Sequence, residues 1–216
     1  MTQIANDEIE AYAFEHSSLE SSHLAEVAAR TRAEQPDSGM MVGRLEGGLL
    51  AMLVHALRPH FVLEIGAFTG YSALSMAAAL GTPGRIVTCE VDPEHAAIAR
   101  ANFAASAYAS QIELKEGPAL ETISSLPGPF DFVFIDADKS GYVEYYEAVL
   151  GKLARRGVIA ADNTLWSGQV IDEADTSEDT RAVRTFNDKV SSDPRVRTVM
   201  LTVRDGLTLI RHAEEP

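Results

Sequence analysis

Acidic residues stand at or just after the ends of most of the apolar runs that we interpret as β-strands. These acids are Glu64, Glu90, Asp136, Asp138 and Asp162. Because ligands of open α/β sheets bind beyond the carboxyl ends of parallel strands, we expect these side chains to gather on one rim. Such a rim suits the cationic end of a ligand, its hydroxyl groups, or a metal ion.

Two carboxylates and one amide oxygen of this rim have the chemistry of a divalent cation site. Asp136 follows one predicted strand, and the pair Asp162-Asn163 follows the next. Hard oxygen ligands favour Mg²⁺ or Ca²⁺ over zinc, and the six histidines show no paired ligand spacing. An equally good interpretation is structural, with Asp136 and Asp138 capping a helix and Asp162-Asn163 starting a loop.

Lys139 is a candidate proton acceptor. It lies three residues after Asp136, at the predicted start of a helix, where a cation is unfavourable beside the helix dipole. Its proximity to the predicted cation site supports a role as a general base. The alternative is an ion-pair partner exposed to solvent.

The stretch 61–72, FVLEIGAFTGYS, predicts a buried strand, a glycine turn and the start of a helix. Its pattern is E-x-G-x-x-x-G, with wider glycine spacing than the dinucleotide pattern G-x-G-x-x-G. Glu64 would repel a pyrophosphate but suits the sulfonium and ammonium groups of S-adenosylmethionine (SAM). The alternatives are a nicotinamide site and glycines that serve packing alone.

Two later positions fit the same nucleoside ligand. Glu90 follows Gly70 by 20 residues, the distance expected for an acid that binds ribose hydroxyls, although a solvated strand end is also possible. The turn Gly117-Pro118-Ala119, after the third predicted strand, would lie near the adenine.

Composition narrows the class of protein and of partner. The 216 residues are 46% apolar and 23% charged, which predicts one globular domain, 1–216. The net charge of −14 disfavours nucleic acid and anionic membranes as partners. One cysteine, no signal peptide and no apolar run of about 18 residues predict a protein of the cytoplasm without a membrane span.

Strands and helices alternate along the chain, which predicts an α/β fold with a mostly parallel sheet, helices on both faces and an antiparallel terminal hairpin at its edge. Residues 1–38 form a predicted helical arm, with one helix over 18–33. Strands are predicted at 61–65, 85–90, 111–115, 131–135, 157–161, 196–203 and 207–211. Helices are predicted at 44–57, 71–80, 92–107, 118–125, 139–153 and 178–192, with a loop at 164–176.

Three strings in order, LEIGAFTGYSAL (63–74), FIDADK (134–139) and ADNTLWSG (161–168), resemble the metal-dependent O-methyltransferases of the catechol and caffeoyl-CoA type. The final stretch DGLTLIRH (205–212) is similar to the last strand of that family, so the resemblance covers roughly residues 39–212. It implies the seven-stranded, Rossmann-like sheet of class I SAM methyltransferases, with the last strand antiparallel.

The resemblance implies roles for individual residues. The metal ligands would be Asp136, Asp162 and Asn163, and Lys139 the general base. The positions expected at SAM are Val42, Glu64, Gly66, Ala67, Tyr71, Ser72, Glu90, Val91, Ala119 and Asp136. The positions expected at the acceptor are Met40, Lys139, Trp166 and Asp205.

The implied reaction is methyl transfer from SAM to one hydroxyl of a small catechol-like aromatic molecule, with Mg²⁺, Mn²⁺ or Ca²⁺ at the site, in a homodimer. Two alternatives stay open, a nicotinamide-dependent oxidoreductase and a SAM-binding protein without catalysis. The chain departs from the family where Gly43-Arg44 stands in place of a frequent Ser-Pro, which affects the predicted lid over SAM.

Overall fold

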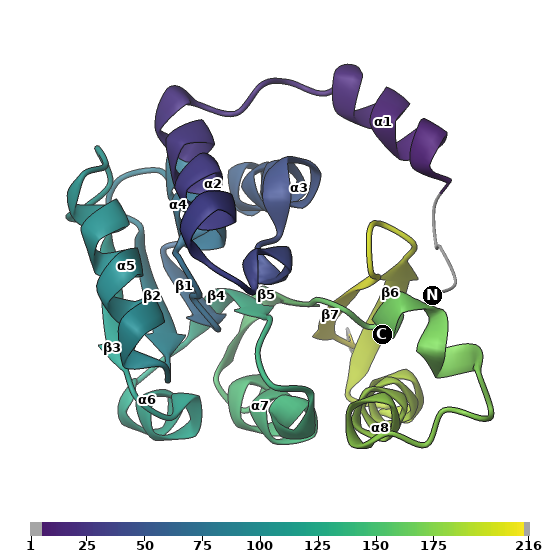
Figure 1. Ribbon diagram of the computed structural model, residues 1–216. Coiled ribbons are helices and arrows are strands. Elements are labelled where there is room, and N and C mark those ends of the chain that lie inside the picture. The colour runs from purple at the N-terminus through teal and green to yellow at the C-terminus, as the bar shows by residue number, and fades with distance from the viewer. Residues whose placement is uncertain (1–5, 214–216) are drawn as a thin grey trace.

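The computed structural model describes residues 6–213, and the predictions for 1–5 and 214–216 lie outside them. Helices and strands alternate from the third helix onward, as Figure 1 shows. The helices are α1 (Asp7–Glu15), α2 (Ser22–Glu34), α3 (Gly43–Leu57), α4 (Tyr71–Ala79), α5 (Pro93–Ala104), α6 (Ala119–Ser125), α7 (Tyr142–Leu150) and α8 (Glu178–Ser192). The short 3₁₀ turns are η1 (Ser38–Met40), η2 (Lys139–Gly141) and η3 (Trp166–Ile171).

The described strands form one seven-stranded sheet in the order β3-β2-β1-β4-β5-β7-β6. They are β1 (Phe61–Ile65), β2 (Arg85–Glu90), β3 (Ile112–Glu116), β4 (Phe130–Ile135), β5 (Leu153–Ala161), β6 (Val196–Leu201) and β7 (Leu207–His212). The pairs among β1 to β5 are parallel, whereas β7 runs antiparallel to both β5 and β6. The predicted fold class is therefore confirmed. Within the terminal hairpin, β6 is the outer strand and β7 lies inside the sheet.

Alternate residues of the central strands face two separate cores. Val62, Ile86 and Phe132 pack with helices α2 to α5, while Leu63 and Val133 pack with α6 to α8. Figure 1 shows α6, α7 and α8 in a row beneath the sheet, with α2, α3 and α4 above it. This arrangement follows from the period of two along a strand, because both faces of a central parallel strand must be apolar.

The largest differences from the predicted boundaries lie at the end of α7 and the start of β5. The helix expected over 139–153 ends at Leu150, and the strand expected to begin at residue 157 begins at Leu153. Leu153 pairs with Phe130, and the Lys152 ammonium donates hydrogen bonds to three carbonyl groups at the end of α6. These tertiary contacts extend β5 through Arg155 and Arg156. From the local sequence alone, this charged pair is typical of the end of a helix.

Segment Ser38–Leu57, which contains η1 and α3, is long and apolar enough to cross a membrane by length and composition alone. This is weak evidence, since core helices of soluble proteins pass the same criterion. In the structure Leu50 and Val54 of α3 are buried against the α2–α5 core. The expectation that no segment spans a membrane stays a prediction.

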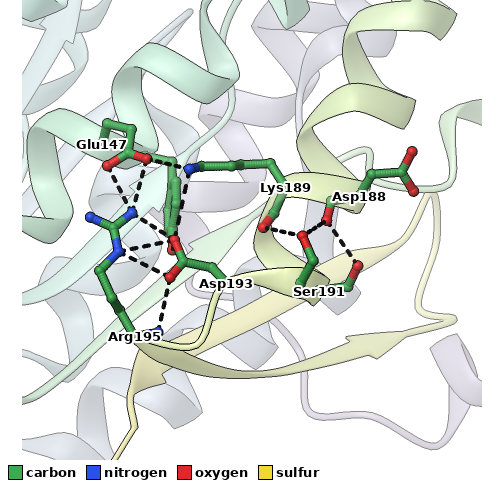
Figure 2. Close-up of polar contacts among 8 residues, drawn as sticks. Glu147, Asp188, Lys189, Ser191, Asp193 and Arg195 are labelled. Atoms are coloured by element: carbon green, nitrogen blue, oxygen red, sulfur yellow. Dashed lines mark hydrogen bonds and ion pairs between the residues drawn. The ribbon is translucent and has the colours of Figure 1, made fainter.

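A network of ion pairs fastens the start of β6 to α7 and α8 (Figure 2). Asp193, whose side chain is 3% exposed, accepts hydrogen bonds from Arg195 Nη2 at 2.6 Å and from Tyr146 Oη at 2.9 Å. Glu147 binds Arg195 Nη2 at 2.9 Å and Lys189 Nζ at 2.7 Å. The hydrogen bonds from Arg195 hold the pKa of Asp193 well below its usual range. The ion-pair network thus requires Asp193 in its carboxylate form.

We expect Asp193→Asn to lower the free energy of unfolding by about 1–3 kcal/mol, because a buried acceptor of charged hydrogen bonds is lost. The pKa of Asp193 is lower in the folded state than in the unfolded chain. Its contribution is therefore complete above pH ~5 and fades as the pH falls further. Urea unfolding at pH 7 and at pH 3.5 measures both effects.

Asp188→Asn provides the matched control, since Asp188 is an exposed acid of α8, the helix that Asp193 follows directly. Its carboxylate makes no contact with the other residues drawn in Figure 2. Equal effects of the two substitutions at pH 7 would contradict a stabilising role of Asp193.

Candidate active site

A cavity of about 700 Å³ lies at the carboxyl ends of the parallel strands, within the usual range for small-molecule sites. It brings together nearly all residues that the sequence predicted for the site. Those that line it are Met40, Val42, Gly66, Ala67, Tyr71, Ser72, Glu90, Val91, Ala119, Asp136, Lys139, Asp162, Asn163, Trp166 and Asp205. Their position is established by the fold, and their individual binding roles stay predictions.

Gly66 lies where the loop after β1 meets the end of β4. Its φ is +96°, and a Cβ atom there would lie 1.9 Å from the backbone oxygen of Asp136. Asp136 N donates to the carbonyl of Ile65 at 2.9 Å, which holds the two strand ends together. Gly66 is thus required both for its conformation and for the close approach of the two segments.

Glu64 is fully buried in β1 and lies outside the lining of the cavity. Its Oε2 accepts a hydrogen bond from Thr88 Oγ1 at 2.5 Å, and the Ser72 hydroxyl lies beside the carboxylate and stabilises its charged form, while Oε1 makes no well-formed hydrogen bond among the described residues. Burial raises the pKa of Glu64 to about 8. An acid without a partner for one oxygen suits a ligand that brings a donor or a positive charge.

Both carboxylate oxygens of Glu90 accept backbone hydrogen bonds, one of them from the loop after β1. Its Oε2 accepts from Phe68 N at 2.7 Å, and its Oε1 accepts from Asp92 N at 3.0 Å. The His95 ring packs edge-on against Phe68, with centroids 4.7 Å apart. Glu90 therefore fixes the cavity wall and still presents carboxylate lone pairs to it.

Three acids meet where the cavity reaches β4 and β5. Asp136 and Asp162 come from the predicted strand ends, and Glu46 comes from α3. Glu46 is 2% exposed, lies beside Asp162, and has no hydrogen-bond partner for Oε1 among the described residues. Burial, reinforced by the charge of Asp136, raises the pKa of Asp162 to about 7. Burial also raises the pKa values of Glu46 and Asp136. The cluster thus favours a positive charge.

The Lys139 side chain, 8% exposed, supplies one such charge. Its Nζ donates to Asn163 Oδ1 at 2.7 Å, to Tyr142 Oη at 2.7 Å and to the carbonyl of Ala137 at 2.9 Å, and it lies 3.5 Å from Asp136 Oδ1. Lys139 begins the turn η2 and not a long helix, because Asp138 accepts from Gly141 N and closes that turn. The solvated ion pair is therefore the wrong alternative for this lysine.

At Gly43-Arg44, where the sequence differs from the family pattern, the neighbouring side chain is Arg204, from the turn between β6 and β7. Gly43 has φ +73°, and a Cβ atom there would lie 3.3 Å from Arg204 Nη1. The same Nη1 lies 3.4 Å from the Met41 carbonyl and 3.5 Å from Glu46 Oε2. Arg44 points to α1, where its guanidinium stacks on the Phe14 ring. Arg204 thus holds the segment before α3 against the cavity.

Sequence reasoning missed Glu46 and Arg204. A detectable signal exists for Glu46, since it is an acid within the otherwise apolar stretch LEGGLLAML. No local signal distinguishes Arg204 from an ordinary residue of a hairpin turn.

Comparison with known proteins agrees with this geometry. The model of the O-methyltransferase family matches residues 14–213. "Probable caffeoyl-CoA O-methyltransferase 1" of Dictyostelium discoideum is 35% identical over 211 residues, which cover 95% of this chain and 92% of that protein. The chain therefore belongs to the O-methyltransferase family and is an O-methyltransferase with relatives of the caffeoyl-CoA type. The nicotinamide alternative is set aside.

Two solved structures extend the likeness to the whole fold. The SAH-bound methyltransferase of Podospora anserina has a TM-score of 0.90 and 33% identity, covering 96% of this chain and 95% of its own. An O-methyltransferase of tomaymycin synthesis from Streptomyces achromogenes, in complex with SAM, has a TM-score of 0.85 and 28% identity, covering 99% and 100%. These relatives support the prediction of SAM as the cofactor.

We expect Gly66→Ala to destabilise the protein by about 2 kcal/mol or more, since a left-handed conformation alone costs about 1–2 kcal/mol and the overlap with Asp136 adds to it. Urea unfolding measures the loss. Gly48→Ala is the control. Gly48 lies within helix α3, and a Cβ atom there would meet nothing within 4 Å. That substitution should be neutral or slightly stabilising, and a loss equal to that of Gly66→Ala would contradict the close-approach argument.

Proposed function

We propose that this O-methyltransferase transfers a methyl group from SAM to one hydroxyl of a catechol-like aromatic acceptor, assisted by a divalent cation. The observation that carries the proposal is the meeting of Asp136, Asp162, Asn163 and buried Lys139 in the same cavity as the glycine loop. One cavity thus offers a place for a cationic methyl donor beside a group that can take a proton.

The cavity suits SAM in size and in charge. Glu64 lies two residues before Gly66, which lines the cavity, and its buried Oε1 favours a donor or a positive charge, while Glu90 lines the cavity directly. Helix α4 begins at this loop without a side-chain cap, so its first N–H groups are available to ligand oxygens.

The oxygen donors at the other end fit a divalent cation. No cluster of three or more His, Cys, Asp or Glu side chains arranged for a metal occurs among residues 6–213. The proposed set has two carboxylates and an amide oxygen, which are ligands of the kind that Mg²⁺ takes together with waters and substrate. Asp136 Oδ1 and Asn163 Oδ1 already face one positive charge, the Lys139 ammonium. Asp136, Asp162 and Asn163 would hold the ion, with the buried Glu46 beside Asp162.

When bound, such an ion polarises the oxygen of the acceptor hydroxyl and makes its proton easier to remove. Lys139 Nζ, in its neutral form, accepts that proton. Tyr142 Oη, which donates to the carbonyl of Asp162 at 3.1 Å, and Asn163 Oδ1 fix the position of Nζ. The remaining work is orientation of the two substrates, which can supply up to ~7–11 kcal/mol of the barrier.

The acceptor end of the cavity is lined by Met40, Trp166 and Asp205. Asp205 accepts a short hydrogen bond from Ser167 N, and this bond holds the turn that carries Trp166. The Trp166 ring lies 5.5 Å from Lys139 Nζ. A flat ring beside the base supports an aromatic acceptor of small size.

We propose a homodimer without nucleic-acid or membrane partners. The support is the net charge of −14 and the row of exposed apolar side chains on α1 and just after it, namely Ile9, Tyr12, Phe14 and Leu19. Light scattering of the purified protein tests the state of assembly.

We expect Asp162→Asn to reduce methyl transfer to a catechol by at least about 100-fold at fixed Mg²⁺, because an anionic ligand becomes neutral. A methyl-release assay measures the rate, and calorimetry measures the affinity for SAH. The affinity for SAH should change less than threefold. If both fall together, the cation site is not separate from the SAM site.

We expect Lys139→Ala to lower kcat by about 10²–10⁴-fold, the usual size of a general-base contribution. Lys139→Arg is the matched variant, since it keeps the positive charge but does not give up its proton at neutral pH. Both variants should be slow at saturating SAM. Full activity of the arginine variant would show that only the charge matters.

A further inference from the structure

The loop between β1 and α4 has an unusual backbone, which its two glycines permit but do not by themselves hold in place. Gly66 and Gly70 have φ values of +96° and +88°, and Phe68, which is not a glycine, has φ +48°. Left-handed conformations of this kind cost about 1–3 kcal/mol for a residue such as Phe68 and persist only where the surroundings hold them. Some other part of the chain must therefore fix the loop.

Thr69, at the centre of this loop, is fully buried and is held from both sides. Its Oγ1 accepts a hydrogen bond from Thr31 Oγ1 of α2 at 2.9 Å. Its backbone oxygen accepts from Asn102 Nδ2 of α5 at 2.8 Å. Thr31 and Asn102 are each 3% exposed, so water does not compete for these bonds.

Helix α2 also orients Asn102. Arg30 Nη2 donates to Asn102 Oδ1 at 2.7 Å, which fixes the amide so that its Nδ2 faces Thr69. His23 Nε2 lies 3.1 Å from the backbone oxygen of Asn102. One face of α2 thus acts on the loop directly through Thr31 and indirectly through Asn102.

A fourth contact joins the segment before α2 to the same site. Tyr71, the first residue of α4 and part of the cavity wall, donates a short hydrogen bond to Glu20. The contacts come from residues 20–31, which are remote in sequence from the loop and do not themselves line the cavity.

We propose that Thr31 and Asn102 are positioning residues for SAM, and that α2 is the latch that keeps the loop in its binding conformation. This inference rests on the proposed binding of SAM in the cavity. A loop that is competent for only part of the time weakens the apparent affinity by that fraction. Binding is reciprocal, so SAM or SAH should in turn stabilise α2.

The test uses the pair Thr31→Val and Thr31→Ser in the full-length protein. Valine removes the hydroxyl at nearly equal volume, whereas serine keeps it. We expect the Kd of SAH from calorimetry to rise about threefold to tenfold for valine and to return close to the wild-type value for serine. The KM for SAM should rise in step, with kcat at saturating SAM within about twofold of wild type.

Hydrogen exchange supplies a readout that a purely structural role does not move. SAH should slow amide exchange across α2 in the wild-type protein and in the serine variant, and less so in the valine variant. An unchanged Kd for Thr31→Val, or an SAH effect on α2 that is equal in all three proteins, overturns the latch. Absence of SAH binding to the wild-type protein instead overturns the proposed function, and the latch with it.

Discussion

The close approach of two strand ends is the constraint on which the site depends. Where β1 and β4 end side by side, Asp136 N bonds to the carbonyl of Ile65, and Gly66 has no Cβ because the carbonyl of Asp136 occupies its place. This contact joins the glycine loop to the acidic turn that carries Lys139. Parallel strands direct both turns to the same edge of the sheet, so a methyl donor and its acceptor can share one cavity.

Further contacts hold the segments that surround the cavity at this edge of the sheet. They come from elements outside the five parallel strands. Helix α2 holds Thr69, Arg204 of the terminal hairpin holds the carbonyl of Met41, and Asp205 holds the turn of Trp166. Buried acids at Glu46, Glu64 and Asp162 lie among these segments with pKa values raised by burial. The protein thus keeps several acids whose charged form is disfavoured by burial close to a cavity, as is common for binding sites.

Much of this arrangement was predictable from the sequence, because the signals are local. The strand at 61–65, the glycine spacing and the acids at strand ends are each contained in a few residues, and topology then brings them together. Glu46, Arg204 and Thr31 were not predictable in their roles, because each acts through a partner more than 30 residues away in sequence. The start of β5 was mispredicted for the same reason, since its pairing with Phe130 overrides the local pattern of Leu153 to Arg156.

In the proposed mechanism, SAM and a divalent cation lie at one edge of a single sheet. The most direct measurement is the relaxation of the proton resonances of bound SAH on addition of Mn²⁺, a paramagnetic substitute for Mg²⁺. We expect strong broadening of the methylene protons beside sulfur, reversed by excess Mg²⁺ and absent in Asp162→Asn. Unbroadened SAH resonances at Mn²⁺ concentrations that support methyl transfer would contradict it.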